Sequence, residues 1–117
     1  TNDSTRAAFE TMVMNGEPVT LAAIVMPSSQ AMVDYVAANP AAIGYVSMAY
    51  LTDTVRPLWV EHEQPTPESV QARRYPFADL IYLLTRTNPP ETVKDFLHFT
   101  LSPEGQASIV SRYGRVR

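Results

Sequence analysis

Hydrophobic residues recur at helical spacing in several parts of the chain, and capping residues mark where the helices begin and end. Serine or threonine precedes most of these stretches, proline occupies the first positions of the later ones, and Asn-Gly or Asn-Pro pairs follow two of them. The expected helices cover residues 6–15, 28–38, 65–70, 91–101 and 102–113.

Extended segments are expected between these helices, at residues 18–25, 43–47, 55–60 and 80–85. The continuous apolar run at 80–85 is typical of a strand that is covered on both faces. Gly44 predicts a close approach of backbone to a neighbour, and Pro57 places its strand near an edge or a bulge. The alternation of helix and strand signals predicts an α/β fold.

Composition narrows the class of protein. The chain has 117 residues, of which 45% are hydrophobic and 18% charged, as in a single globular domain. Its formal charge is -3, and no basic run indicates a nucleic-acid partner. The absence of cysteine excludes thiol catalysis, disulfides and cysteine-ligated zinc, and no cofactor is expected. No apolar stretch is as long as a membrane span, and no segment is expected to be a signal peptide.

The first expected helix begins with a group of residues suited to an anion. Ser4 and Thr5 supply hydroxyls, and Arg6 supplies a planar, permanently charged fork of donors. Unpaired N–H groups and a partial positive charge gather at a helix start, so a phosphate-like ligand would be stabilised there. The alternative is that Asp3, Ser4 or Thr5 only caps the helix and that Arg6 lies in solvent.

The histidines offer little other chemistry. His62 lies between Glu61 and Glu63 in a loop, where a solvated loop is the expectation and no metal site is predicted. His98 falls within the helix at 91–101, where a partly buried structural role is expected. No Ser-His-Asp arrangement or glycine-rich phosphate loop is visible, so an enzyme is not expected.

Two further groups have structural expectations. Arg73 and Arg74 are expected to be a solvated pair, with lining a cleft or facing a partner as the alternatives. The aromatic side chains of Tyr45, Tyr50 and Trp59 are expected in the core or in the wall of a cleft, with a position over a ligand as the alternative.

Six short motifs in series resemble the phosphate-binding component of bacterial ABC importers, from residue 3 to residue 116. In chain order they read Ser-Thr-Arg-x-x-Phe-Glu, Asn-Pro-Ala-Ala-Ile-Gly-Tyr-Val-Ser, Val-Arg-Pro-Leu, Pro-Thr-Pro-Glu, Arg-Tyr-Pro-Phe and Phe-Leu-x-Phe-x-Leu-Ser-Pro-Glu-Gly-Gln. Each motif is weakly specific by itself, and the series in this order is the signal.

The resemblance implies a type 2 periplasmic-binding-protein fold, in which two α/β lobes close on a ligand. By analogy, residues 1–75 belong to the second, inserted lobe and residues 76–117 to the C-terminal part of the first lobe. The first half of such a protein would precede Thr1. An incomplete sheet leaves unpaired strand edges, so self-association or pairing with a missing N-terminal segment is expected.

At the anion site the family pattern is Ser-Gly-Thr-Arg, and Thr5 and Arg6 match it directly. Ser4 replaces glycine and matches through its backbone N–H and its hydroxyl. Asp3 replaces serine, and its carboxylate would repel a dianion unless one of the two is protonated or the side chain turns away. A carboxylate can also accept a hydrogen bond from a protonated phosphate, so Asp3 is kept with Ser4, Thr5 and Arg6 as the candidate site.

The resemblance implies a solute-binding domain that captures phosphate or a related oxyanion for an ABC-type importer. It performs no chemistry, works by lobe closure, and has the membrane subunits of the transporter as partners. Its place is the periplasm or the cell exterior, with an upstream segment as a candidate membrane anchor. The alternative is a sensory or interaction module of the same fold with lost or altered ligand specificity, which the Asp3-Ser4 pair supports.

Overall fold

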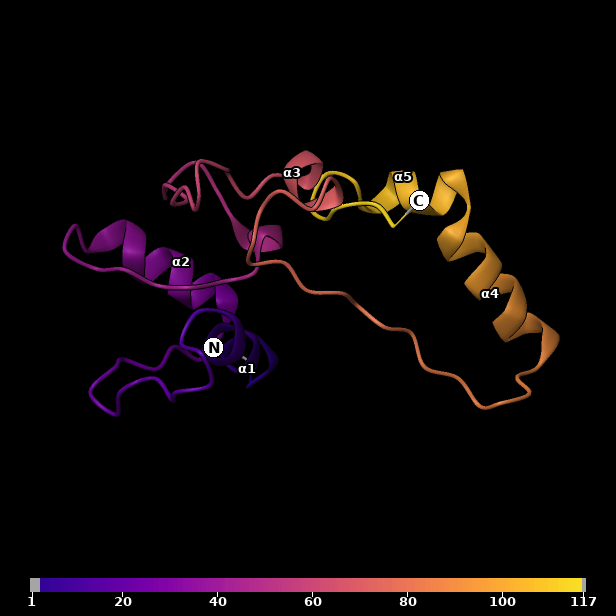
Figure 1. Cartoon of the computed structure of the whole chain (residues 1–117), viewed down its shortest axis with the longest axis horizontal. Coiled ribbons are helices and arrows are strands. Elements are labelled where there is room, and N and C mark those ends of the chain that lie inside the picture. Colours follow the sequence, from indigo (N-terminus) through magenta and orange to yellow (C-terminus); the bar gives the residue numbers. More distant parts are fainter. Residues whose placement is uncertain (1–2, 117) are drawn as a thin grey trace. The chain divides into compact units, whose positions relative to one another are not determined.

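A computed structural model describes residues 3–116, and the chain divides into two units, Thr1–Trp59 and Val60–Arg117. The described part is built from helices and long connecting segments (Figure 1). The lobe boundary expected near residue 75 stays a prediction.

The first unit begins with α1 (Asp3–Met12). After the helix the chain turns through Asn15 and Gly16, whose φ angles are 54° and 87°. Asparagine and glycine adopt this left-handed conformation at low cost, which is why they end the helix. The turn predicted at Asn15 and Gly16 is therefore confirmed. The helix itself both begins and ends three residues earlier than the sequence indicated, at Asp3 and Met12.

Helix α2 (Ser29–Ala38) forms as its caps predict. The Ser28 hydroxyl accepts a hydrogen bond from the backbone N–H of Ala31 at 3.1 Å. At the other end, the side-chain amide of Asn39 donates to the Tyr35 carbonyl at 2.7 Å, just before Pro40. Each cap satisfies a backbone group that the helix leaves unpaired.

The inner face of α2 forms the apolar centre of the first unit. Met32 and Val33 are only 8% and 2% exposed, and α2 packs against the short helix η1 (Met48–Tyr50). An atom added at the Cβ position of Gly44 would lie 2.5 Å from the Met32 Sδ atom, so the predicted close approach at Gly44 is confirmed.

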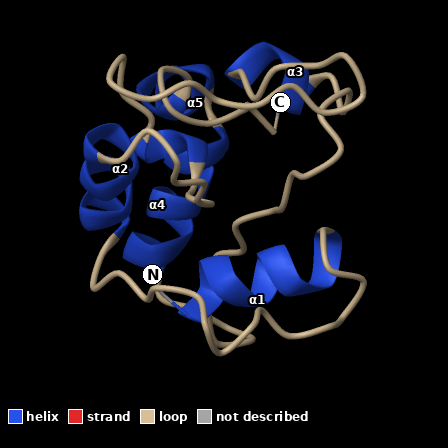
Figure 2. Cartoon of the chain, turned by 90° about the vertical axis from the view of Figure 1, so that its left-hand side faces the viewer, coloured by secondary structure: helices blue, strands red, loops and turns tan. Residues whose placement is uncertain are grey.

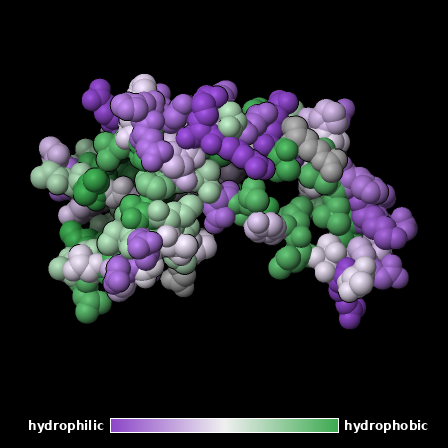
Figure 3. Space-filling model, in the orientation of Figure 1, coloured by the Kyte–Doolittle hydropathy of each residue, from purple (hydrophilic) through white to green (hydrophobic). Residues whose placement is uncertain are grey.

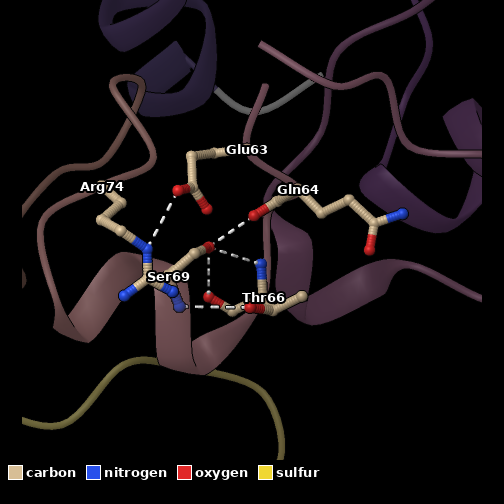
Figure 4. Close-up of polar contacts among 5 residues, drawn as sticks. All are labelled: Glu63, Gln64, Thr66, Ser69 and Arg74. Carbon is tan, nitrogen blue, oxygen red and sulfur yellow. Dashed lines mark hydrogen bonds and ion pairs between the residues drawn. The ribbon is translucent and has the colours of Figure 1, made fainter. Parts of the chain in front are cut away.

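The second unit opens with a polar turn and α3 (Pro67–Gln71) (Figure 4). The Thr66 hydroxyl accepts from the Ser69 N–H at 3.1 Å, and the Ser69 hydroxyl accepts from the Thr66 N–H at 3.1 Å. This reciprocal capping box fixes the helix start, and the Ser69 hydroxyl also donates to the Gln64 carbonyl. Ser69 is 2% exposed, so the turn closes around it.

Helices α4 (Glu91–Leu101) and α5 (Pro103–Ile109) pack against each other through a sharp corner at Ser102. The Ser102 hydroxyl accepts from the Gly105 N–H at 3.1 Å and so caps α5. The side-chain amide of Gln106 donates to the Thr100 carbonyl at 2.7 Å, and its oxygen accepts from the Val116 N–H at 2.8 Å. Gln106 thereby holds the end of α4 and the C-terminal segment together.

The last helix is shorter than expected. It ends at Ile109 rather than near Tyr113. Beyond it, Gly114 packs closely on α3, because a Cβ added to Gly114 would lie 3.0 Å from the backbone nitrogen of Gln71. The tail therefore packs against α3 instead of continuing the helix.

The expected strands do not pair with one another in the described part of the chain. Figure 2 draws helices and loops there, and the one β-bridge is the local pair Val60 and Glu63. An extended segment becomes a strand of a sheet only when a neighbouring strand takes up its backbone N–H and C=O groups. Apart from the Val60–Glu63 bridge, no such pairing is seen for the segments at 18–25, 43–47, 55–60 and 80–85 in the described residues. The α/β layering is therefore not seen in residues 3–116.

The apolar run at 80–84 is the clearest example of an expected strand without a neighbour. Its five side chains are between 55% and 91% exposed. In Figure 1 this segment is an open trace that leads to α4, and Figure 3 shows hydrophobic side chains at the surface along it. The two-face coverage expected for this run is absent in the described structure.

Candidate anion-binding site

Three of the four predicted anion-binding residues lie in the first turn of α1, where their side chains are described. Ser4 is exposed, whereas Thr5 and Arg6 are partly buried. The fourth, Asp3, begins the helix, and its side chain lies outside the described part of the structure. The ten residues of α1 are long enough to give its start the partial positive charge on which anion binding relies.

Among the described residues, two of the first unit contact the Arg6 side chain. Its Nε atom donates to the Glu10 carboxylate at 2.8 Å, one helical turn further along α1. Its Nη2 atom lies 3.4 Å from the Val19 carbonyl oxygen, which belongs to the segment after the helix. The capping-only alternative expected Arg6 to lie in solvent. Its side chain is 38% exposed, but these contacts hold it against the first unit.

Glu10 closes a small ring with the same two residues. The carboxylate oxygen that accepts from Arg6 also accepts from the Val19 N–H at 2.9 Å. These hydrogen bonds lower the pKa of Glu10 below its usual range. The hydrogen bond from Arg6 has the larger effect and the one from the Val19 N–H the smaller. Glu10 is thus held as a carboxylate.

Sequence reasoning missed Glu10 and Val19. An arginine followed four residues later by a glutamate is a recognised helical ion pair, so the spacing of Arg6 and Glu10 was a usable signal. No local pattern marks Val19, because its peptide meets α1 only after the turn at Asn15 and Gly16.

An aromatic contact also holds α1 in the first unit. The rings of Phe9 and Tyr45 stack with their centres 4.1 Å apart and their planes 9° from parallel. Tyr45 lies in the extended segment after α2, so the stack joins α1 to the rest of the first unit. Tyr45 was expected in the core or in the wall of a cleft, and it is partly buried in this contact.

The other two aromatic residues expected in the core or in a cleft wall, and His98, are more exposed than Tyr45. Tyr50 is 44% exposed and Trp59 is 63% exposed, so neither is a core residue of its unit. His98 is exposed, and the partly buried role expected for it is wrong. It follows Leu97, which is partly buried, and the next residue along a helix points about 100° away.

The remaining polar candidates form a surface turn. Arg74 donates through its Nε atom to the Glu63 carboxylate at 3.0 Å, and this pair is visible in Figure 4. Arg73 is exposed and has a φ angle of 57°. His62, also exposed, has a φ angle of 69° in the tight turn between Val60 and Glu63. Within residues 3–116 no group of three or more metal-ligating side chains gathers at one point.

A family model described as a PBP superfamily domain matches residues 1–104. The chain belongs to this family. The match contains the whole of α1, and it agrees with the type 2 periplasmic-binding-protein fold that the resemblance implies.

Several curated relatives of this PBP domain are similar over most of the chain. The phosphate-binding protein PstS of Bacillus subtilis is 31% identical over 117 residues, which are 98% of this chain and 38% of that protein. The phosphate-binding protein PstS 2 of Streptococcus agalactiae serotype V is 30% identical over 96 residues, or 81% of this chain and 32% of that protein. The PBP domain therefore spans about a third of the length of these relatives.

No solved structure matches this PBP domain significantly. In the described part of the chain, no helix has the length and hydrophobicity that crossing a membrane requires.

Proposed function

We propose that this chain is part of a solute-binding protein that captures phosphate or a similar oxyanion for an ABC-type importer. The observation that carries the proposal is the similarity of 98% of the chain to a phosphate-binding protein of Bacillus subtilis. In this role the protein is not an enzyme. Its partners are the anion and the membrane subunits of the transporter, and it works in the periplasm or outside the cell.

The start of α1 supports an anion as the ligand. Ser4, Thr5 and Arg6 contribute hydroxyls, backbone N–H groups and a guanidinium within a single turn. Charge-assisted hydrogen bonds of this kind are about twice as strong as those between neutral groups, so Arg6 is expected to contribute most. Asp3 belongs to the proposed site as an acceptor for a protonated anion.

The proposed fold is the two-lobed α/β architecture of type 2 periplasmic-binding proteins, with residues 1–75 in one lobe and residues 76–117 in the other. The exposed apolar run at 80–84 supports it, since five such residues in a row are typical of a central strand. We propose that strands from elsewhere in the full-length protein cover this run, because the curated relatives are about three times as long as the chain.

Calorimetric titration of the full-length protein with phosphate tests the function, with sulfate as the competing anion. Arg6→Ala should weaken phosphate binding by about 10- to 100-fold, the range expected for a hydrogen bond to a charged group. Arg74→Ala is the matched control, because Arg74 also pairs with a glutamate, at 3.0 Å, and lies in the second unit. It should leave the affinity within about twofold.

Two results would contradict the functional proposal. One is the absence of phosphate binding by the wild-type protein, and the other is an equal loss of affinity in the Arg6 and Arg74 variants.

Hydrogen exchange tests the proposed fold. The backbone N–H groups of residues 80–85 should exchange slowly in the full-length protein at every concentration, because strand pairing protects them. Protection that appears only at high concentration would mean that a second copy covers the run. Fast exchange throughout would contradict the paired strand.

A further inference from the structure

Glu10, Arg6 and Val19 contact one another at the proposed anion site. One carboxylate oxygen of Glu10 accepts from the Arg6 Nε atom at 2.8 Å and from the Val19 N–H at 2.9 Å. The Val19 carbonyl oxygen lies 3.4 Å from the Arg6 Nη2 atom. Both ends of the Val19 residue, its N–H and its C=O, therefore meet the same ion pair.

These contacts engage one edge of the guanidinium. The group is planar and rigid, so holding its Nε and Nη2 atoms fixes the orientation of the whole plane. An arginine side chain without such contacts has large rotational freedom, which is lost when a ligand immobilises it. A guanidinium that is already oriented avoids that loss.

We propose that Glu10 is a positioning residue, which orients the Arg6 guanidinium for the oxyanion through the contacts shared with Val19; this rests on the proposed function of the site. Glu10 acts through Arg6 and does not itself contact the anion.

The opposite role would be competition, in which the Glu10 carboxylate occupies the guanidinium in place of the ligand. The geometry favours positioning, because a pure competitor needs no second anchor, whereas the Val19 N–H ties the carboxylate down. The Glu10 and Arg6 side chains are 24% and 38% exposed, and an ion pair of such partly exposed groups is weak enough not to exclude a dianion. The lowered pKa of Glu10 agrees with a carboxylate that stays charged while it holds Arg6.

The test compares Glu10→Ala with Glu10→Gln in the full-length protein, by calorimetric titration with inorganic phosphate. Glu10→Ala removes the anchor and should weaken phosphate binding about fivefold, which is the cost of immobilising one long side chain. Glu10→Gln keeps a side-chain oxygen as an acceptor and should restore the affinity to within about twofold of wild type.

A second readout follows the guanidinium directly, in the absence of phosphate. The NMR signal of the Arg6 Nε–H group should be resolved and slow to exchange in wild type and in Glu10→Gln. It should be lost to exchange with water in Glu10→Ala. Glu63→Gln is the matched control, because Glu63 pairs with Arg74 in the second unit and its substitution should change neither readout.

Each outcome decides something. Tighter or unchanged phosphate binding in Glu10→Ala would overturn the positioning role, and tighter binding in both Glu10 variants would establish competition. An unchanged Arg6 Nε–H signal in Glu10→Ala would also overturn it. If wild type shows the protected signal but binds no phosphate, the proposed function fails while the contact between Glu10 and Arg6 stands. A Glu10→Ala protein that does not fold would leave Glu10→Gln, in which loss of the signal overturns the proposal.

Discussion

Thr1–Trp59 and Val60–Arg117 bury different kinds of side chain. Among the described residues, the buried hydrophobic side chains are Met32 and Val33 of the first unit, whereas the buried polar side chains are Ser69 and Gln106 of the second. Apolar contacts depend on volume and tolerate exchange of similar shapes, while hydrogen bonds depend on particular donors and acceptors. The first unit should therefore respond to changes of volume, and the second to changes of hydrogen-bonding groups.

The largest loss of stability is expected at Gly105, where neither apolar packing nor hydrogen bonding is decisive. There the surrounding backbone leaves no room for a side chain. A Cβ atom added at Gly105 would overlap the Phe99 carbonyl oxygen, and backbone cannot give way as a side chain can. Gly105→Ala should lower the free energy of unfolding by about 3 kcal/mol, measured by urea denaturation. Ser108→Ala, an exposed change in the same helix, should cost less than about 1 kcal/mol. A cost for Gly105→Ala as small as that of Ser108→Ala would contradict the tight corner.

Met32→Ala tests the apolar side of the comparison. It should lower the free energy of unfolding by about 2.5 kcal/mol, because Met32 is 8% exposed and its loss leaves a cavity against Gly44. Met14→Ala, in the same unit but 36% exposed, should cost under about 1 kcal/mol. Faster hydrogen exchange should be confined to the first unit, and equal loss of protection in both units would break the comparison.

Gln106→Leu tests the polar side at similar volume. The leucine would leave the Thr100 carbonyl and the Val116 N–H without their partner, and the free energy of unfolding should fall by about 1.5 kcal/mol. Gln30→Leu is the matched control, because Gln30 donates to Asp34 on an exposed surface of α2. If both substitutions lower the free energy of unfolding by the same small amount, the buried hydrogen bonds of Gln106 do not stabilise the second unit.

The smallest effect is a dependence on pH in the first unit. The pKa of Glu10 is lowered in the folded chain, so its ionised form is favoured by folding. That contribution is present above the unfolded carboxyl pKa of about 4.5 and is lost as the pH falls through the lower folded value. Unfolding curves of wild type should therefore fall more steeply below pH 4.5 than those of Glu10→Gln. Parallel curves would contradict the lowered pKa.

Helices were the predictable part of the fold because their signals are local. Ser28, Thr66 and Ser102 cap helices as their positions in the sequence indicate, and each cap lies within three residues of the group that it satisfies. The strands were not borne out, since a strand needs a neighbour that no local pattern supplies. Their place in an α/β fold remains a prediction about the full-length protein.

In the candidate site too, residues with a local sequence signal could be predicted and residues brought in from a distance could not. Thr5 and Arg6 were proposed from a short motif, and the structure places both in the first turn of α1. Val19 could not be found, because the turn through Asn15 and Gly16 brings its peptide back to the helix. A contact of this kind depends on the path of the chain between two elements, so the sequence of either element alone does not predict it.

The apolar run at 80–84 has a consequence for aggregation. Six consecutive residues from Leu80 to Thr85 contain no charge and no proline, which is the composition of segments that stack into fibrils when they are left uncovered. Asp79 and Arg86 flank the run with opposite charges, and charged neighbours of this kind act as gatekeepers against such stacking. Replacing both by alanine should shorten the delay before thioflavin-positive aggregates form, while leaving the start of α1 unaffected.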